Sequence, residues 1–237
     1  MKTLVSSLLI THVAAGSLAL LLGLVAMLAQ KGSRLHNRTG LVYVWCMTYV
    51  ALSAVLLFVV QPFTLFRLFL TGVAVFSFYL STTGYRAIVL KRAGLSLTTP
   101  PSFDRWLTYI TLLVSVGMMG YGLQLITAGT SSFLATLFTF FGGATFVFSG
   151  QDFWRFGKPT ARMFPFFHHI ARMAGSYIAA FTAFLVNNNM RFLPTDAPEW
   201  IPLASWIAPS LIGGMMIGRT IAHYKKKFAT RGTSVAV

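Results

Sequence analysis

Seven predominantly apolar runs, each about 20 residues long, dominate this sequence. A helix rises 1.5 Å per residue, so each run can cross a hydrocarbon core about 30 Å thick. Only 10% of the residues are charged, whereas a soluble domain carries about 25%. We therefore predict an all-α integral membrane bundle of about seven transmembrane helices. The runs cover residues 4–29, 41–60, 63–85, 106–126, 132–150, 164–187 and 201–223.

The lysines and arginines are distributed unevenly among the gaps between these runs. Fifteen of the 19 fall in gaps on one side or near the C-terminus, while only Lys2 and Arg191 fall on the other side. Short cytoplasmic loops carry an excess of lysine and arginine. We therefore predict that the N-terminus is outside and the C-terminus is cytoplasmic. Compact loops suit a bacterial cytoplasmic (inner) membrane.

The first run shares some features with a cleaved signal peptide, because Lys2 precedes it and small residues lie at 14–16. Its apolar sequence continues to Ala29, which is longer than the apolar region of about 7–15 residues in signal peptides. We expect an uncleaved first span. The predicted organisation is a seven-helix transmembrane domain over 1–224 and a basic cytoplasmic tail over 225–237.

The formal charge of +15 would suit a nucleic-acid-binding protein in another context. Here the basic residues lie in short gaps between spans, where they determine topology. We therefore expect no nucleic-acid partner, and we expect the lipid bilayer to be the main partner. The single cysteine, Cys46, lies in an apolar run and indicates nothing about compartment. The oligomeric state is not indicated.

The predicted helix over 164–187 contains the strongest anomaly. His168, Arg172, Gly175 and Ala179 follow helical spacing and share one face. Arg172 lies about 12 Å along the helix from Phe164, inside the hydrocarbon region. A guanidinium at this depth is costly, so it must have a partner or face water.

Few acidic residues are available to pair with Arg172. Asp196 and Glu199 belong to an outer loop, and Asp104 adjoins Arg105 at the inner surface. Asp152 lies at the inner end of the preceding span, so it is the candidate partner. Two alternatives follow. Either Asp152 and Arg172 form a structural ion pair, or Arg172 binds an anionic ligand such as a carboxylate, a phosphate or a propionate.

Four of the five histidines gather toward the inner side: His36, His168, His169 and His223. They are the candidate cofactor ligands. His12 lies about 27 Å from the inner end of its helix by helix rise, so it cannot share a metal with them. We expect His12 to be an isolated, hydrogen-bonded residue that packs against small side chains.

The inner half of the third run is rich in hydroxyl groups over residues 77–86. Such a stretch either packs against protein or lines a wet cavity, since lipid does not satisfy polar groups. Ser81 and Tyr85 are therefore candidate ligand-binding residues together with Arg172 and Asp152. The simpler interpretation is that serine and threonine hydroxyls bond to carbonyls of their own helix.

Two segments resemble a bacterial family of predicted membrane proteins described only as a domain of unknown function. They are KGSRLHNRTGLVY at 31–43, after a helix bearing His12, and HIARMAGSYIAAFTAFLVN at 169–187. This resemblance implies the multi-pass topology and supplies no activity.

A second likeness is to b-type cytochrome membrane proteins of the ascorbate-reductase kind, through His12, Gly16 and the Leu35–His36 pair. Two haems would need two outer histidines, and only His12 is there. The likeness therefore implies at most one inner haem b, held by His36 or His223 together with His168 or His169. Heptahelical zinc hydrolases share the span count but use a spaced histidine pair, whereas His168 and His169 are adjacent.

Three function classes remain from the sequence. The first is a carrier, sensor or accessory protein with a cytoplasmic-side polar cavity for a small anionic ligand. The second is an electron-transfer protein that binds one haem b or a quinone near the inner face. The third is a metal-dependent membrane hydrolase. The sequence contains no glycine-rich phosphate loop, nucleophile elbow or metal-spaced motif, so catalytic residues are not indicated.

Overall fold

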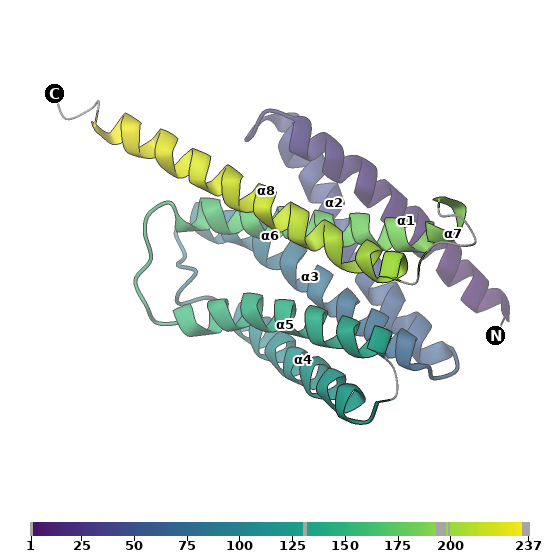
Figure 1. Ribbon diagram of the computed structural model, residues 1–237. Helices are drawn as coiled ribbons and strands as arrows, with labels where there is room; N and C mark the ends of the chain where they lie inside the picture. The colour runs from purple at the N-terminus through teal and green to yellow at the C-terminus, as the bar shows by residue number, and fades with distance from the viewer. Residues whose placement is uncertain (1, 130–131, 193–197, 199, 234–237) are drawn as a thin grey trace.

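The computed structural model describes residues 2–129, 132–192, 198 and 200–233. Every regular element within these residues is an α-helix (Figure 1). Seven helices are long and apolar enough to cross a membrane, which confirms the predicted fold class. The helices are α1 (Lys2–Leu28), α2 (Arg34–Val60), α3 (Leu65–Arg92), α4 (Ser102–Thr127), α5 (Ser132–Arg155), α6 (Phe164–Asn187), the short α7 (Asn189–Phe192) and α8 (Trp200–Thr233).

Local sequence explains where the helices begin and end. The Ser33 hydroxyl accepts a hydrogen bond from the backbone amide of His36 at the start of α2, as an N-cap serine does. Thr64 caps α3 in the same way. The connections after α3 and α5 each contain a glycine with positive φ, Gly94 at 70° and Gly157 at 77°. Glycine adopts this conformation without the steric cost of a Cβ atom.

The C-terminal helix extends past the predicted boundary between the membrane domain and the basic tail. The predicted tail begins at residue 225, and α8 continues through this basic segment to Thr233. Lysine and arginine are good helix formers, and no glycine or proline lies between residues 219 and 231 to end the helix. The basic tail thus begins as an extension of the last helix (Figure 1).

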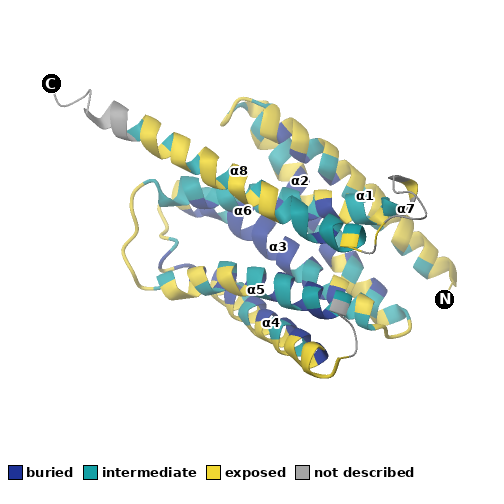
Figure 2. Cartoon of the chain, viewed as in Figure 1, coloured by how far each residue is buried: buried dark blue, intermediate teal, exposed yellow. Residues whose placement is uncertain are grey.

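Helix α3 lies at the centre of the bundle, between the α1–α2 pair and the α4–α5 pair (Figure 1). It contacts α2, α4, α5 and α6, while α8 packs mainly on α6. Half of the most apolar window of α3 is buried, a larger share than in the other spans. Figure 2 shows dark blue, buried residues along α3 and yellow, exposed residues on the outward faces of α1, α4 and α8.

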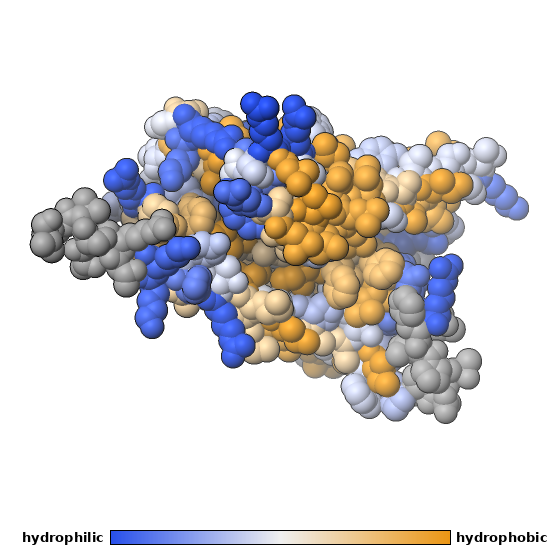
Figure 3. All heavy atoms as spheres, turned by 90° about the horizontal axis from the view of Figure 1, so that it is seen from above, coloured by the Kyte–Doolittle hydropathy of each residue, from blue (hydrophilic) through white to orange (hydrophobic). Residues whose placement is uncertain are grey.

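The outward faces of the helices are apolar. Ile10, Leu113 and Met215 are each more than half exposed, as suits side chains that contact lipid tails. In Figure 3, hydrophobic atoms cover the middle of the visible face, and hydrophilic side chains gather toward its ends. The length, composition and surface of these helices identify the chain as an integral membrane protein.

An aromatic core fills one half of the bundle. Phe69, near the start of α3, packs against Phe138, Phe141 and Trp206, with ring centroids 5.2–5.5 Å apart. All four side chains are buried. Phe69 is about 15 Å along α3 from Tyr79, so this core lies well away from the polar residues that follow in the same helix.

Candidate functional site

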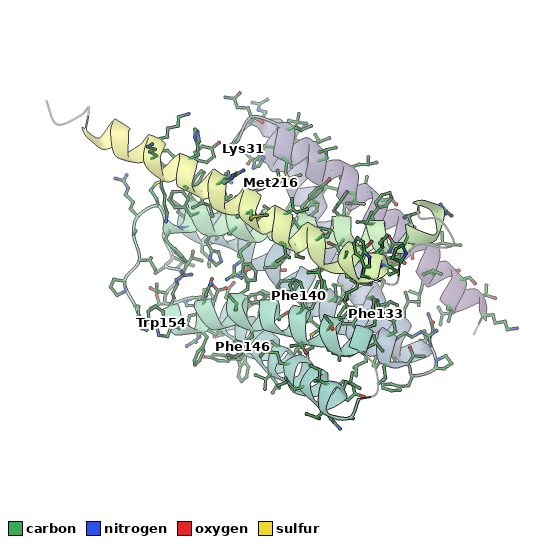
Figure 4. The ribbon with its side chains drawn as sticks, viewed as in Figure 1. Lys31, Phe133, Phe140, Phe146, Trp154 and Met216 are labelled. Carbon is green, nitrogen blue, oxygen red and sulfur yellow. The ribbon has the colours of Figure 1, made fainter. Side chains whose placement is uncertain are left out.

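The other half of the bundle is polar, and it lies at the end where basic residues gather. We call this the basic end. There α1, α3 and α5 end and α2, α4 and α6 begin. Figure 4 places Lys31 at the turn between α1 and α2, and Trp154 where α5 leads into its loop.

A row of buried polar side chains runs from the basic end into the bundle. It occupies one stripe on each of α4, α5 and α6, where its members recur every three or four residues and so lie on one side of each helix. We call this row the polar seam. Its members are Asp104, Thr108, Thr111 and Ser115 on α4, Thr145, Ser149 and Asp152 on α5, and His168, Arg172 and Ser176 on α6.

Arg172 is almost completely buried, at 1% relative exposure. Its Nη2 atom lies 2.8 Å from Oδ1 of Asp152 and also donates to the Phe148 carbonyl over 2.8 Å. The guanidinium stacks over the Phe148 ring at 4.5 Å. Of the two alternatives that the sequence left open, the structure contains the ion pair.

Asp152 has two further neighbours. The hydroxyl of fully buried Tyr79 donates a 2.5 Å hydrogen bond to Oδ2. Nδ1 of His168 lies 3.8 Å from Oδ1. The carboxylate is therefore held from α3 and α6 at once, and these contacts reduce the cost of burying its charge.

One donor of the cluster lacks an acceptor. Nη1 of Arg172 is buried and has no hydrogen-bond partner in the described part of the chain. Buried polar groups are nearly always hydrogen-bonded, so this guanidinium nitrogen is an exception among the described residues.

Close contact between α3 and α6 is needed to form this cluster. Gly84 of α3 packs directly on α6, where an added Cβ would lie 2.9 Å from Cβ of Arg172 and 3.0 Å from the backbone nitrogen of Met173. Small residues permit such close approach between membrane helices. Gly84 thereby lets Tyr79 and Arg172 reach the same carboxylate.

A narrow cavity of about 40 Å³ reaches the cluster from the basic end. Five ionisable side chains line it: Arg86, Asp104, Asp152, Arg155 and His168. A wider pocket of about 390 Å³ adjoins it at the surface, because Pro100 and Phe156 line both. The two form a path from the surface to the Asp152 carboxylate.

The loops at the mouth of this path are bonded to each other. The amide of Gly157, after α5, donates to the Thr98 carbonyl, before α4, over 2.8 Å. The Ser96 and Thr98 hydroxyls are 2.8 Å apart. The Gly157–Thr98 bond joins the two connections that form the rim of the path, and the Ser96–Thr98 contact lies within the first of them.

The cavity and the pair behind it carry an excess of positive charge. Arg86 forms a bidentate ion pair with Asp104, and Arg172 pairs with Asp152. Within the described residues Arg155 has no carboxylate partner, and its guanidinium lies 4.6 Å above the Phe164 ring. Three guanidiniums therefore face two carboxylates, and the site has a net charge of about +1 with His168 neutral.

His36 and His169 form a second cluster, between the α1–α2 turn and the other side of α6. Their ring centroids are 6.3 Å apart. Nδ1 of His36 bonds to the Ala26 carbonyl and Nδ1 of His169 to the Gly84 carbonyl, each over 2.8 Å. In both rings this contact leaves Nε2 as the nitrogen available to a ligand.

Lys31 lies at the same turn, and its Nζ donates to the Ala26 and Met27 carbonyls that end α1. Partial burial lowers the pKa of the Lys31 amine, because desolvation disfavours its charged form.

The remaining candidate residues lie elsewhere. His223 is on α8, where its ring contacts Tyr224. Ser81 donates to the Phe78 carbonyl of its own helix, as the simpler interpretation expected. Tyr85 packs on a cluster with Tyr43 and Met47, away from the cavity.

His12 forms a 2.8 Å hydrogen bond with Ser53, as expected for an isolated histidine. Asp104 pairs with Arg86 rather than with its neighbour Arg105, because α3 and α4 are antiparallel and bring Arg86 alongside it. Asp196 and Glu199 lie outside the described residues.

Four residues of the site were not named as site residues from the sequence: Tyr79, Arg86, Asp104 and Arg155. The Arg86–Asp104 pair could have been predicted. Arg86 lies near the end of α3 and Asp104 near the start of α4, so the two side chains lie at the same end of consecutive helices. Tyr79 belongs to the polar stretch 77–86, but its contact with Asp152 could not be predicted, because packing decides which faces of α3 and α5 meet. Arg155 carried no signal of its own. Comparison with known family models, curated proteins and solved structures finds no significant match to this chain.

We expect Arg172→Gln and Asp152→Asn each to lower the free energy of unfolding by about 3–5 kcal/mol, because each leaves one buried charge unpaired. The double variant should be no less stable than either single variant. Thermal or denaturant unfolding in detergent measures all three. The more exposed Arg86–Asp104 pair is the matched control and should give a smaller coupling energy. Additive losses at Arg172 and Asp152 would contradict a buried ion pair.

Proposed function

We propose that this protein is a membrane carrier, sensor or accessory protein that binds a small anionic ligand in the cavity at its basic end. The observation that supports this is the charge of the site: three guanidiniums surround two carboxylates, and both carboxylates are already paired. In a site of low dielectric constant an excess cation attracts an anion strongly.

Arg155 is the residue proposed to contact the ligand. It lines the cavity, and among described side chains it has an aromatic contact and no acidic one. Arginine presents a planar set of donors that matches a carboxylate. His168 lines the same cavity as a further donor, and Arg172 pairs with Asp152 deeper in the bundle.

The cavity size restricts the ligand. A volume of 40 Å³ holds about three water molecules, at about 10–15 Å³ each. An anion with three or four non-hydrogen atoms, such as formate or acetate, has this size. Larger anions would be confined to the wider outer pocket.

We further propose that the basic end faces the cytoplasm of a bacterial cell and that the N-terminus is outside. The lysine and arginine distribution supports this orientation, because these residues accumulate in short cytoplasmic loops. The ligand would then enter from the cytoplasm.

A second candidate function is electron transfer through one haem b, and the His36–His169 pair favours it. Two imidazoles bound through Nε2 to one ion have ring centroids about 6 Å apart, since each metal–nitrogen bond is about 2 Å long. The observed separation is 6.3 Å. Carbonyl contacts at Nδ1 are also typical of metal-binding histidines. His36 and His169 would hold the haem, which would supply one-electron redox chemistry when bound.

For the anion site, we expect formate and acetate to raise the melting temperature of the detergent-purified protein in a concentration-dependent way. Gluconate at the same ionic strength should have a smaller effect, because it is too large for the inner cavity. Arg155→Gln should remove the formate response.

Lys158→Gln is the matched control. It removes one cation from the connection after α5, but Lys158 lies over the Trp154 ring and does not line the cavity. The formate response should survive this change. Equal responses from Arg155→Gln and the unaltered protein would exclude binding at this cavity.

For the orientation, a reporter fused after residue 237 should be active in the cytoplasm, and one fused ahead of α1 should be active outside. Alkaline phosphatase and a fluorescent protein distinguish the two sides. A C-terminal reporter that is active only outside would reverse the proposed topology.

For haem, the purified protein should show a Soret band that is lost in His36→Ala and in His169→Ala. His168→Gln should keep the band, because His168 faces Asp152 instead of the His36–His169 pair. Colourless protein from haem-supplemented cells would exclude this second candidate.

A further inference from the structure

Asp152 belongs to two environments at once. Its carboxylate lines the cavity that opens toward the basic end, and the same carboxylate pairs with Arg172 in the interior. An anion that enters the cavity must therefore approach a negative charge. This arrangement makes the charge state of Asp152 a determinant of anion binding.

Charged and titratable groups face Asp152 from every helix that packs around it. Tyr79 and Arg86 approach from α3, and Asp104 from α4. Arg155 lies one turn further along α5, while His168 and Arg172 approach from α6. Asp104 is held by Arg86 through two hydrogen bonds, and Asp152 is the other carboxylate that lines the cavity.

We propose that anion binding in this cavity is linked to uptake of one proton by Asp152, so that proton and anion occupy the site together. This inference rests on the proposed function, since it specifies how the same cavity takes its ligand. The proton adds to a carboxylate oxygen of Asp152, and Arg172 keeps its own proton and charge.

Electrostatics gives the direction of the linkage. With Asp152 ionised the site has a charge of about +1, and with Asp152 protonated it has about +2. Protonation also converts the carboxylate from an acceptor into a donor that can bond to the anion. Both effects favour the anion. By reciprocity, a bound anion favours the proton equally.

The unpartnered nitrogen of Arg172 supports the same conclusion independently. Arg172 has one nitrogen bound to Asp152 and another, Nη1, with no acceptor in the described chain. When Asp152 is neutral, the guanidinium loses its only counter-charge, and a second anion can replace it.

The protons reach Asp152 from the basic end. The cavity and the adjoining pocket form a path on that side, and the aromatic core around Phe69 and Trp206 fills the other half of the bundle. Hydroxyls of the polar seam, including Thr108 at 3.5 Å from the Tyr79 hydroxyl, surround the carboxylate. A polar lining of this kind suits a proton path in a membrane protein.

The test measures proton uptake directly. Formate is added to detergent-purified protein in lightly buffered solution between pH 6 and 8, with a pH-indicator dye as readout. Formate stays ionised in this range, so uptake reports on the protein. We expect about one proton per formate bound, and formate affinity should rise as the pH falls, by up to about tenfold per pH unit.

Asp152→Asn should abolish proton uptake and make formate affinity independent of pH, because asparagine resembles the protonated acid. Asp104→Asn is the matched control, because it makes the same substitution in the same cavity but at the Arg86–Asp104 pair. In this variant the pH dependence of formate affinity should remain. If Asp152→Asn is too unstable to purify, the Arg172→Gln/Asp152→Asn double variant restores charge balance and should also lack proton uptake.

The outcomes separate this inference from the proposed function. If the unaltered protein binds no formate or acetate at all, the proposed function fails and the inference fails with it. If formate binds without proton uptake, or if Asp152→Asn retains proton uptake, the proposed function stands and the linkage is overturned. Loss of uptake in His168→Gln with retention in Asp152→Asn would assign the proton to His168 and also overturn it.

Discussion

The ion pair between Asp152 and Arg172 constrains the rest of the structure more than any other interaction. A charge inside the hydrocarbon region is tolerated only with a partner or water, so α5 and α6 must keep these two side chains together. Tyr79 adds α3 to the same cluster through its hydrogen bond to the carboxylate. Gly84 permits the α3–α6 approach that this requires. The contacts of the central helix therefore follow largely from burying one pair of charges.

The two halves of the bundle differ in composition: one contains the aromatic core, and the other contains the polar residues and the cavity. Around Phe69, aromatic rings interlock and fill the space with dispersion contacts. Toward the basic end, hydroxyls and charged groups replace these rings, and the close packing gives way to a narrow cavity. Lipid provides no hydrophobic drive between helices, so the aromatic half supplies shape-specific packing while the polar half depends on hydrogen bonds. The cavity is therefore open toward the basic end, while the aromatic core fills the opposite half of the bundle.

The seven spans could be predicted from sequence because hydrocarbon thickness fixes the length of each apolar run. The shared face of His168 and Arg172 was also predictable from helical spacing, and so was Asp152 as the partner with the shortest connection. Other members of the site depend on how helices rotate against each other. Tyr79 meets Asp152 across 73 residues of sequence, and the turn of α3 that directs it inward is set by packing around Gly84. Adjacent His168 and His169 belong to different clusters for the same reason: successive helical residues point about 100° apart.

The shortage of acidic residues explains why the site retains positive charge. In the described chain two carboxylates, those of Asp104 and Asp152, line the cavity, and each is bonded to a guanidinium. A structural role alone would require one arginine for each carboxylate, which Arg86 and Arg172 already provide. Arg155 exceeds that requirement, and its contact with the Phe164 ring offsets only part of the cost of a partly buried cation. Under the proposed function, a small anion in the cavity beside Arg155 would balance this remaining positive charge.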